Sequence, residues 1–105
     1  MVRDELIRSG ARAIAEAAGC PARVLLFGSR ARGEAAPDSD VDLLVVMREV
    51  EDRFAESARL ARLAGELQLP ADVIVVSEAQ AEDWGAVRGT MLHDALAEGE
   101  LLAQT

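Results

Sequence analysis

Two aspartates separated by one residue, Asp40 and Asp42, stand at the start of a short apolar segment. In an extended strand, residues two apart point to the same face, so these side chains project together with Cα atoms about 6.6 Å apart. Neighbouring carboxylates repel each other, and a divalent cation with oxygen ligands relieves that repulsion. Magnesium suits the pair because it accepts a few carboxylates, keeps several waters and binds substrate phosphate oxygens. Asp40 and Asp42 are therefore candidate magnesium ligands.

A third aspartate, Asp72, opens another apolar segment, where a charged side chain requires a reason. If this segment forms a strand beside the one that holds Asp42, the three carboxylates form a triad. Each part also has a simpler interpretation. An isolated Asp-x-Asp is most often a turn or a cap, and Asp72 alone could be a strand-end residue hydrogen-bonded to a loop.

A glycine and a serine, Gly28 and Ser29, follow an earlier apolar segment. Gly28 lets the backbone approach a ligand closely, and Ser29 with the amides after it can hold a phosphate at a helix N-terminus. Arg30 and Arg32 are nearby cations that could neutralise phosphate charge, although exposed arginines in weak ion pairs are a common alternative. The phosphate-type turn, the carboxylate pair and the third carboxylate together favour a site for a metal ion and a phosphate over the simpler interpretations.

Hydrophobic periodicity and turn residues predict the elements that position these groups. The predicted order is a helix over 3–18, a strand over 24–27, a brief helix over 29–32, a loop over 33–39, a strand over 41–47, a helix over about 50–69, a strand over 71–76 and a helix from the capping-box sequence of 77–80. Gly85 and Gly89 weaken that last helix, which resumes until Gly99, and 101–103 could add an edge strand or a tail. In the helix over 50–69, the spacing predicts Phe54, Ala58, Ala61 and Leu67 inward and Arg53, Arg59, Arg62 and Glu66 outward.

Strands that alternate with helices predict an α/β domain with a small mixed sheet flanked by helices. The length of 105 residues fits one domain over 1–105, and the sequence contains no internal repeat.

Composition excludes several classes of function. The net charge of −8 at pH 7 argues against free-standing nucleic-acid binding, because the surface repels a phosphate backbone. The sequence has no lysine, which excludes Schiff-base chemistry and the lysine-dependent Walker loop. No apolar run approaches the roughly 20 residues that span a bilayer. A single cysteine, Cys20, fits a reducing compartment, so we expect a cytoplasmic protein.

The segment GSRARGEAAPDSDVDLLVV, from Gly28 to Val46, reproduces the signature G-S-x10-D-x-D. With this segment the sequence resembles the minimal nucleotidyltransferases of the polymerase-β superfamily, and the resemblance extends over roughly 24–76. It implies the nucleotidyltransferase fold and the transfer of a nucleoside monophosphate from a nucleoside triphosphate to a hydroxyl, with release of pyrophosphate.

The resemblance also implies roles for single residues. Asp40 and Asp42 would be metal ligands, and Asp72 would help to bind the second of two Mg²⁺ ions or deprotonate the hydroxyl. Gly28 and Ser29 would hold the triphosphate, with Arg30 and Arg32 as further phosphate contacts. ATP is the expected substrate.

Minimal members of the family resemble the antitoxin half of toxin–antitoxin pairs, whose partner is a helical HEPN-domain ribonuclease. The leading hypothesis is therefore an enzyme that transfers AMP to a hydroxyl of such a partner and silences it. The sequence has no tyrosine, so a tyrosine acceptor must lie on another molecule, whereas self-modification on serine or threonine stays open. The alternatives are a non-catalytic module that neutralises its partner by contact and a small-molecule adenylyltransferase.

A C-terminal apolar stripe contains Trp84, Met91, Leu92 and Leu96. These side chains either cover the sheet or meet a partner or a second copy of the chain, since small domains often complete their burial by association. His93 is the only histidine and receives no chemical role.

Overall fold

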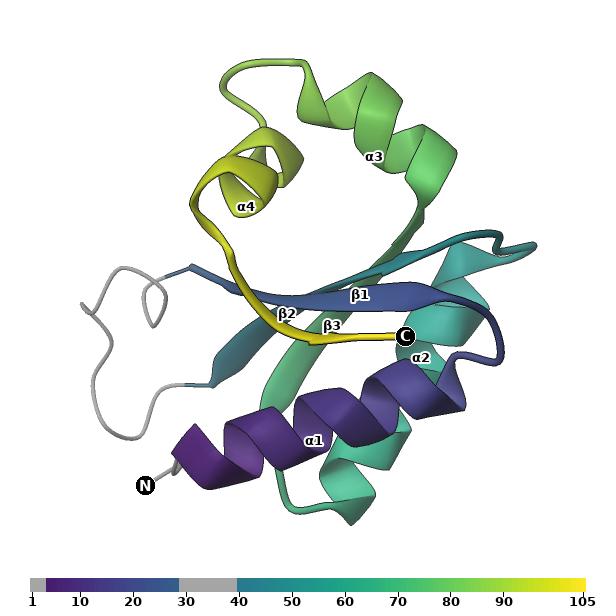
Figure 1. The fold of residues 1–105 in the computed structure, drawn as a ribbon, viewed down its shortest axis with the longest axis vertical. Helices are drawn as coiled ribbons and strands as arrows, with labels where there is room; N and C mark the ends of the chain where they lie inside the picture. Colours follow the sequence, from purple (N-terminus) through teal and green to yellow (C-terminus); the bar gives the residue numbers. More distant parts are fainter. Residues whose placement is uncertain (1–3, 29–39) are drawn as a thin grey trace.

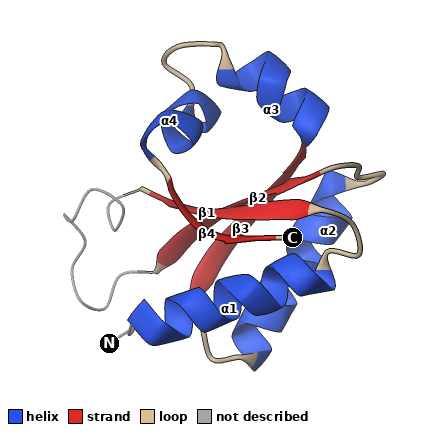
Figure 2. Cartoon of the chain, in the orientation of Figure 1, coloured by secondary structure: helices blue, strands red, loops and turns tan. Residues whose placement is uncertain are grey.

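The computed structural model describes residues 4–28 and 40–105, which form a four-stranded sheet with helices on both faces (Figures 1 and 2). The elements are α1 (Asp4–Ala17), β1 (Ala22–Phe27), β2 (Val41–Met47), α2 (Arg53–Glu66), β3 (Ala71–Ser77), α3 (Glu78–Gly85), α4 (Met91–Glu98) and β4 (Glu100–Gln104). The predicted α/β class with a mixed sheet is confirmed. The brief helix predicted over 29–32 and the loop over 33–39 lie outside the described residues.

The sheet has the strand order β3-β2-β1-β4. Strand β1 pairs antiparallel with β2 and with β4, whereas β2 and β3 are parallel and are connected through α2. The pairing places Phe27 and Asp72 on either side of Asp42. Three separate segments of the chain therefore meet at one end of the sheet.

Both faces of the central strands are buried, because strand side chains alternate between the faces. In β2, Leu43 and Val45 pack against α1 and α2, while Leu44 and Val46 belong to the cluster that α3 and α4 cover. Figure 1 shows this layering, with α3 and α4 on one side of the sheet and α1 and α2 on the other. Continuous apolar runs in β1 and β2 follow from this double burial.

The structure confirms several element boundaries that local sequence signals predict. The capping box is present, since the Ser77 hydroxyl accepts from the Gln80 amide at 3.1 Å and the Gln80 side chain accepts from the Ser77 amide at 3.0 Å. The predicted break lies between α3 and α4, where Gly89 has a φ of 83°. The segment predicted over 101–103 as an edge strand or a tail forms the edge strand β4.

The prediction for α2 was wrong in its length and in part of its buried face. The helix starts only at Arg53, because the side chain of Asp52 accepts hydrogen bonds from two amides of the first turn. Phe54 is 72% exposed, and Ala58 and Leu67 are also exposed, whereas the buried residues are Leu60 and Ala64. Alanines occur on several faces of this helix, so the apolar pattern alone does not fix the side that meets the sheet. Among the described residues, no helix is long and apolar enough to cross a membrane.

Candidate active site

The parallel pairing of β2 and β3 sets Asp42 directly beside Asp72. Both residues share a face with the next alternate residues, Leu44 and Ile74, which belong to the cluster under α3 and α4. Adjacent strands lie about 4.8 Å apart, so the two side chains leave the sheet as neighbours. Asp40 is exposed and comes two residues before Asp42, just ahead of β2. The strand arrangement that the triad requires is therefore present.

Gly28 follows β1 directly and lies against the Asp42 carboxylate. Its φ is 78°, a left-handed conformation that side chains rarely adopt. A Cβ atom at this position would overlap a carboxylate oxygen of Asp42. The glycine thus does two things, since it turns the chain after the strand and leaves the space that the carboxylate fills. The other three predicted phosphate contacts, Ser29, Arg30 and Arg32, lie outside the described residues.

The three carboxylates interact electrostatically at Asp42. Partial burial raises the pKa of Asp42, and the negative charges of Asp72 and Asp40 raise it further. A carboxylate that is disfavoured by two like charges gains from a cation beside it.

The residues fit magnesium by the chemistry of their donors. Within residues 4–28 and 40–105, no three acidic, histidine or cysteine side chains lie close enough together to hold one ion. Magnesium does not require such a cage, because it is usually bound through one or two carboxylates, waters and substrate phosphates. Asp42 and Asp72 can supply those carboxylates, and Asp40 lies two residues before Asp42.

A cleft of about 670 Å³ opens beside the two paired aspartates. Its wall on α2 consists of small residues, namely Ser57, Ala58 and Ala61, which leave room next to the edge strand β3. The Ser57 hydroxyl also accepts a hydrogen bond from the amide of Val75 at 3.0 Å and so satisfies part of that edge. Sequence reasoning missed this wall, although a cluster of small residues on one side of a helix could have indicated it.

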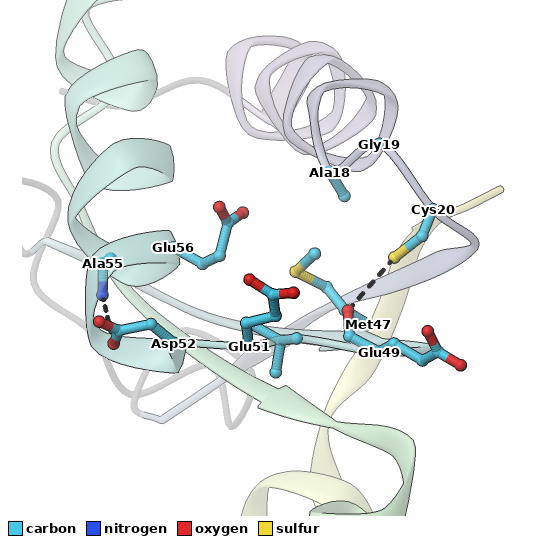
Figure 3. Close-up of a pocket in the computed structure, with 10 residues that line it drawn as sticks. Ala18, Gly19, Cys20, Met47, Glu49, Glu51, Asp52, Ala55 and Glu56 are labelled. Carbon is cyan, nitrogen blue, oxygen red and sulfur yellow. Dashed lines mark hydrogen bonds between the residues drawn. The ribbon is translucent and has the colours of Figure 1, made fainter.

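A larger hollow of about 740 Å³ lies elsewhere, between the end of α1 and the start of α2 (Figure 3). Its lining includes the carboxylates of Glu49, Glu51, Asp52 and Glu56. Two of them have structural partners, since Asp52 caps α2 and Glu56 pairs with Arg59 at 2.7 Å. An acidic hollow repels a triphosphate, and it contains none of the predicted site residues, so we do not assign the nucleotide to it.

The predicted C-terminal apolar stripe is divided in the structure. Leu92 and Leu96 are partly buried against the sheet, as the covering interpretation requires, while Trp84 is 41% exposed. The side chain of Met91 lies outside the described part of the chain. The Arg53 guanidinium carbon lies 5.1 Å from the centre of the Trp84 ring, which the prediction of an outward Arg53 did not foresee.

The sequence matches one known protein family over most of its length. The family described as "Nucleotidyltransferase domain" matches residues 7–94, most of the chain. The chain belongs to this family. A relative from Methanocaldococcus jannaschii, provisionally named a protein adenylyltransferase, is 36% identical to this nucleotidyltransferase domain over 53 residues. That match covers 50% of the chain and 52% of the relative, so the chain spans about half the length of this relative.

Solved structures have the same fold. A provisionally named minimal nucleotidyltransferase is 33% identical, with a TM-score of 0.59 over 91% of this chain and 92% of its own. A toxin–antitoxin structure with AMP-PNP has a TM-score of 0.66 at 20% identity, covering 93% of this chain and 73% of its own. A Shewanella oneidensis complex of a tri-AMPylated HEPN toxin with its MNT antitoxin has a TM-score of 0.60 at 19% identity, with coverages of 98% and 74%. At these low identities the last two support the fold alone.

Proposed function

We propose that this protein is a magnesium-dependent nucleotidyltransferase that transfers AMP from ATP to a hydroxyl group of a partner protein. One observation carries the proposal: Asp42 and Asp72, 30 positions apart in the sequence, are paired at the edge of a cleft. Membership of the nucleotidyltransferase domain family supports the same reaction class.

In this proposal the residues of the cleft have distinct roles. Asp40 and Asp42 hold magnesium, with Asp72 as the third carboxylate of a two-ion site. Magnesium held by these carboxylates would supply stabilisation of charge on the entering and leaving oxygens of an in-line displacement. Asp72 accepts the proton of the acceptor hydroxyl, whose oxygen forms a bond to the α-phosphorus while the bond to the pyrophosphate oxygen breaks. Gly28 leaves space for the Asp42 carboxylate.

Three names among the similar proteins support AMP and a protein acceptor. One structural neighbour contains AMP-PNP, another contains an AMPylated HEPN toxin, and the M. jannaschii relative is named for protein adenylylation. From these similar proteins we infer that the partner of this chain is a HEPN-type protein. Because the chain has no tyrosine, a tyrosine acceptor would belong to the partner. A reaction that consumes ATP, together with a free thiol at Cys20, fits the cytoplasm.

The test is label transfer from ATP. The purified protein, Mg²⁺, ATP labelled at the α-phosphate and a candidate HEPN protein should give a labelled partner. An Asp42→Ala variant should give none, while Asp94→Ala, which removes an exposed carboxylate of α4, should behave as the wild type. Labelling by the Asp42→Ala variant would contradict the mechanism.

A second candidate function is neutralisation of the partner by contact alone. It is favoured by one observation, that a similar structure is a complex of a HEPN toxin with its MNT antitoxin. Inhibition of the partner without nucleotide, unchanged by Asp40→Ala, would support this function and reject the catalytic one.

A further inference from the structure

An apolar pocket of about 90 Å³ lies on the same face of the sheet as the paired aspartates. Phe27, Leu44 and Ile74 contribute to its floor, and Arg53 and Trp84 contribute to its rim. Two of these residues, Phe27 and Ile74, also line the carboxylate cleft. The pocket and the cleft are therefore adjacent and share a wall.

The spacing between the pocket and the carboxylates suits a nucleotide. Leu44 and Ile74 are the next residues on the same face after Asp42 and Asp72, which places them about 6.6 Å further along their strands. The ribose of a nucleotide separates the base from the α-phosphate by a span of this order. A phosphate held at the carboxylates thus brings the base to the pocket.

The rim offers a flat surface with a cation beside it. The Arg53 guanidinium carbon lies 4.5 Å from the ring centre of Phe54 and 5.1 Å from that of Trp84. Both distances are within the range of cation–π attraction, so Arg53 lies against the indole while much of the Trp84 side chain stays exposed. Aromatic side chains of this kind stack on nucleic-acid bases without reading their sequence.

We propose that this pocket binds the base of the nucleoside triphosphate, with the base stacked on Trp84. The inference rests on the proposed function, because the phosphates must first be held at the carboxylates. It adds the residues that hold the base, namely Trp84 and Arg53 at the rim and the apolar side chains of the floor.

Binding of a base requires a movement of the Trp84 side chain. A cavity of about 150 Å³ is known to hold benzene, so 90 Å³ admits only part of a base while the indole keeps its present position. The C-terminal end of α3, which carries Trp84, is tied to α4, since Nδ1 of His93 donates to the Gly85 carbonyl oxygen at 2.6 Å. The indole therefore moves about its own side-chain bonds and the backbone stays in place.

The chemistry of the walls predicts weak selectivity among purines. Nearly all of the lining is apolar, so the floor cannot distinguish the hydrogen-bonding edges of adenine and guanine. Stacking area then decides affinity, which favours purines over pyrimidines. ATP and GTP should bind with similar affinity, and both should bind more tightly than CTP and UTP.

The sequence provides a direct probe, because Trp84 is the only tryptophan and there is no tyrosine. Intrinsic fluorescence excited at the indole band therefore reports on Trp84 alone. Titration of the whole chain with AMP-PNP and Mg²⁺ should change this emission. Inorganic triphosphate with Mg²⁺ should leave it unchanged, because it carries no base.

Variants at the rim test the same contact by calorimetry. Trp84→Ala should weaken AMP-PNP binding by roughly 5- to 150-fold, the range expected for loss of one stacked base. Trp84→Phe should retain part of the affinity, and Val87→Ala, at an exposed apolar residue that does not line the pocket, should retain all of it. None of the three should alter the binding of inorganic triphosphate.

The possible failures are distinguishable. AMP-PNP binding with unchanged Trp84 emission and unchanged affinity in Trp84→Ala would overturn the base pocket and leave the proposed function intact. If Trp84→Ala lost label transfer to the partner but kept its AMP-PNP affinity, the pocket would belong to the acceptor instead. Absence of AMP-PNP binding to the wild type would reject the proposed function and this inference with it.

Discussion

The carboxylate cleft and the acidic hollow both contain aspartates, and the hollow is the larger of the two. In the hollow, Asp52 caps a helix and Glu56 pairs with an arginine, so these charges contribute to the fold. In the cleft, the pKa of Asp42 is raised by burial and by two other carboxylates, so its charge is held at a cost. The difference indicates that the energetic cost of a carboxylate identifies the candidate site better than the size of a hollow or the number of its acidic groups.

The largest expected difference between the two regions is in catalysis. Asp72→Asn should lower the rate of AMP transfer by about 10²- to 10⁴-fold, because it removes a proton acceptor and a charge beside the magnesium site. Glu51→Gln, in the acidic hollow, should stay within about twofold of the wild type. Initial rates of pyrophosphate release measure both. Equal losses in the two variants would end the distinction between the regions.

A second comparison uses two glycines with left-handed backbones, Gly28 in the cleft and Gly19 in the hollow. A Cβ added at Gly19 would have no neighbouring atom within 4 Å. Gly19→Ala should therefore lower the free energy of unfolding by about 1 kcal/mol through backbone strain alone. Alanine at Gly28 also overlaps Asp42 and should cost about 2–3 kcal/mol.

Chemical denaturation measures these two costs, and the transfer rate gives a second readout. Folded Gly28→Ala should lose most of its activity, since the Asp42 carboxylate is displaced, while folded Gly19→Ala should keep it. An active Gly28→Ala protein would mean that the position of this carboxylate is not critical.

A third prediction concerns a carboxylate with a structural role. Asp52→Ala should lower the free energy of unfolding by about 1 kcal/mol, because two amides at the start of α2 lose their acceptor. Asp52→Asn should restore most of the loss, since asparagine caps helices about as well. Urea denaturation compares the three proteins, and similar losses for Ala and Asn would show that the charge, and not the cap, is what matters.

The smallest effect has the opposite sign. Asp42→Asn should raise the free energy of unfolding slightly at neutral pH, because it removes a partly buried carboxylate that two others repel. The folded protein binds the Asp42 proton more tightly than the unfolded chain does. The contribution of Asp42 to the free energy of unfolding therefore falls as the pH rises from the ordinary carboxyl pKa of 3.8 through the raised pKa of the folded protein.

The advantage of Asp42→Asn should therefore shrink as the pH drops from the raised pKa of Asp42 toward the ordinary carboxyl value of 3.8. Denaturation curves without magnesium at several pH values test this dependence. An advantage that grows in acid would contradict the direction assigned to the pKa of Asp42.

The parts of the structure that depend on local signals were predictable from the sequence. Strand β2 matches its predicted range of 41–47, and the cap at Ser77 was visible in four residues. The sequence predicts that Asp42 and Asp72 are adjacent only if their strands are neighbours, since the residues of a strand do not determine which strand it pairs with. The resemblance to minimal nucleotidyltransferases, which extends over roughly 24–76, supports that condition.

Features that depend on contacts between distant segments were not predictable. Arg53 and Trp84 lie on different helices, and nothing in either segment indicates that a guanidinium will meet an indole. The orientation of α2 was also misjudged at Phe54, because the periodicity of an alanine-rich helix permits more than one buried face. Ser57 was missed because its role depends on the free edge of β3.

The position of Asp72 on an edge strand has a consequence for how activity responds to stress. Within the described sheet, β3 pairs with β2 alone, so its fraying requires the opening of one ladder and of the single hydrogen bond from the Val75 amide to Ser57. Amides at such margins commonly exchange with solvent through local openings that need less free energy than global denaturation. Heating or mild denaturant should therefore inactivate the protein while most of its helical circular dichroism persists, and the protection of the β3 amides against deuterium should decline together with turnover.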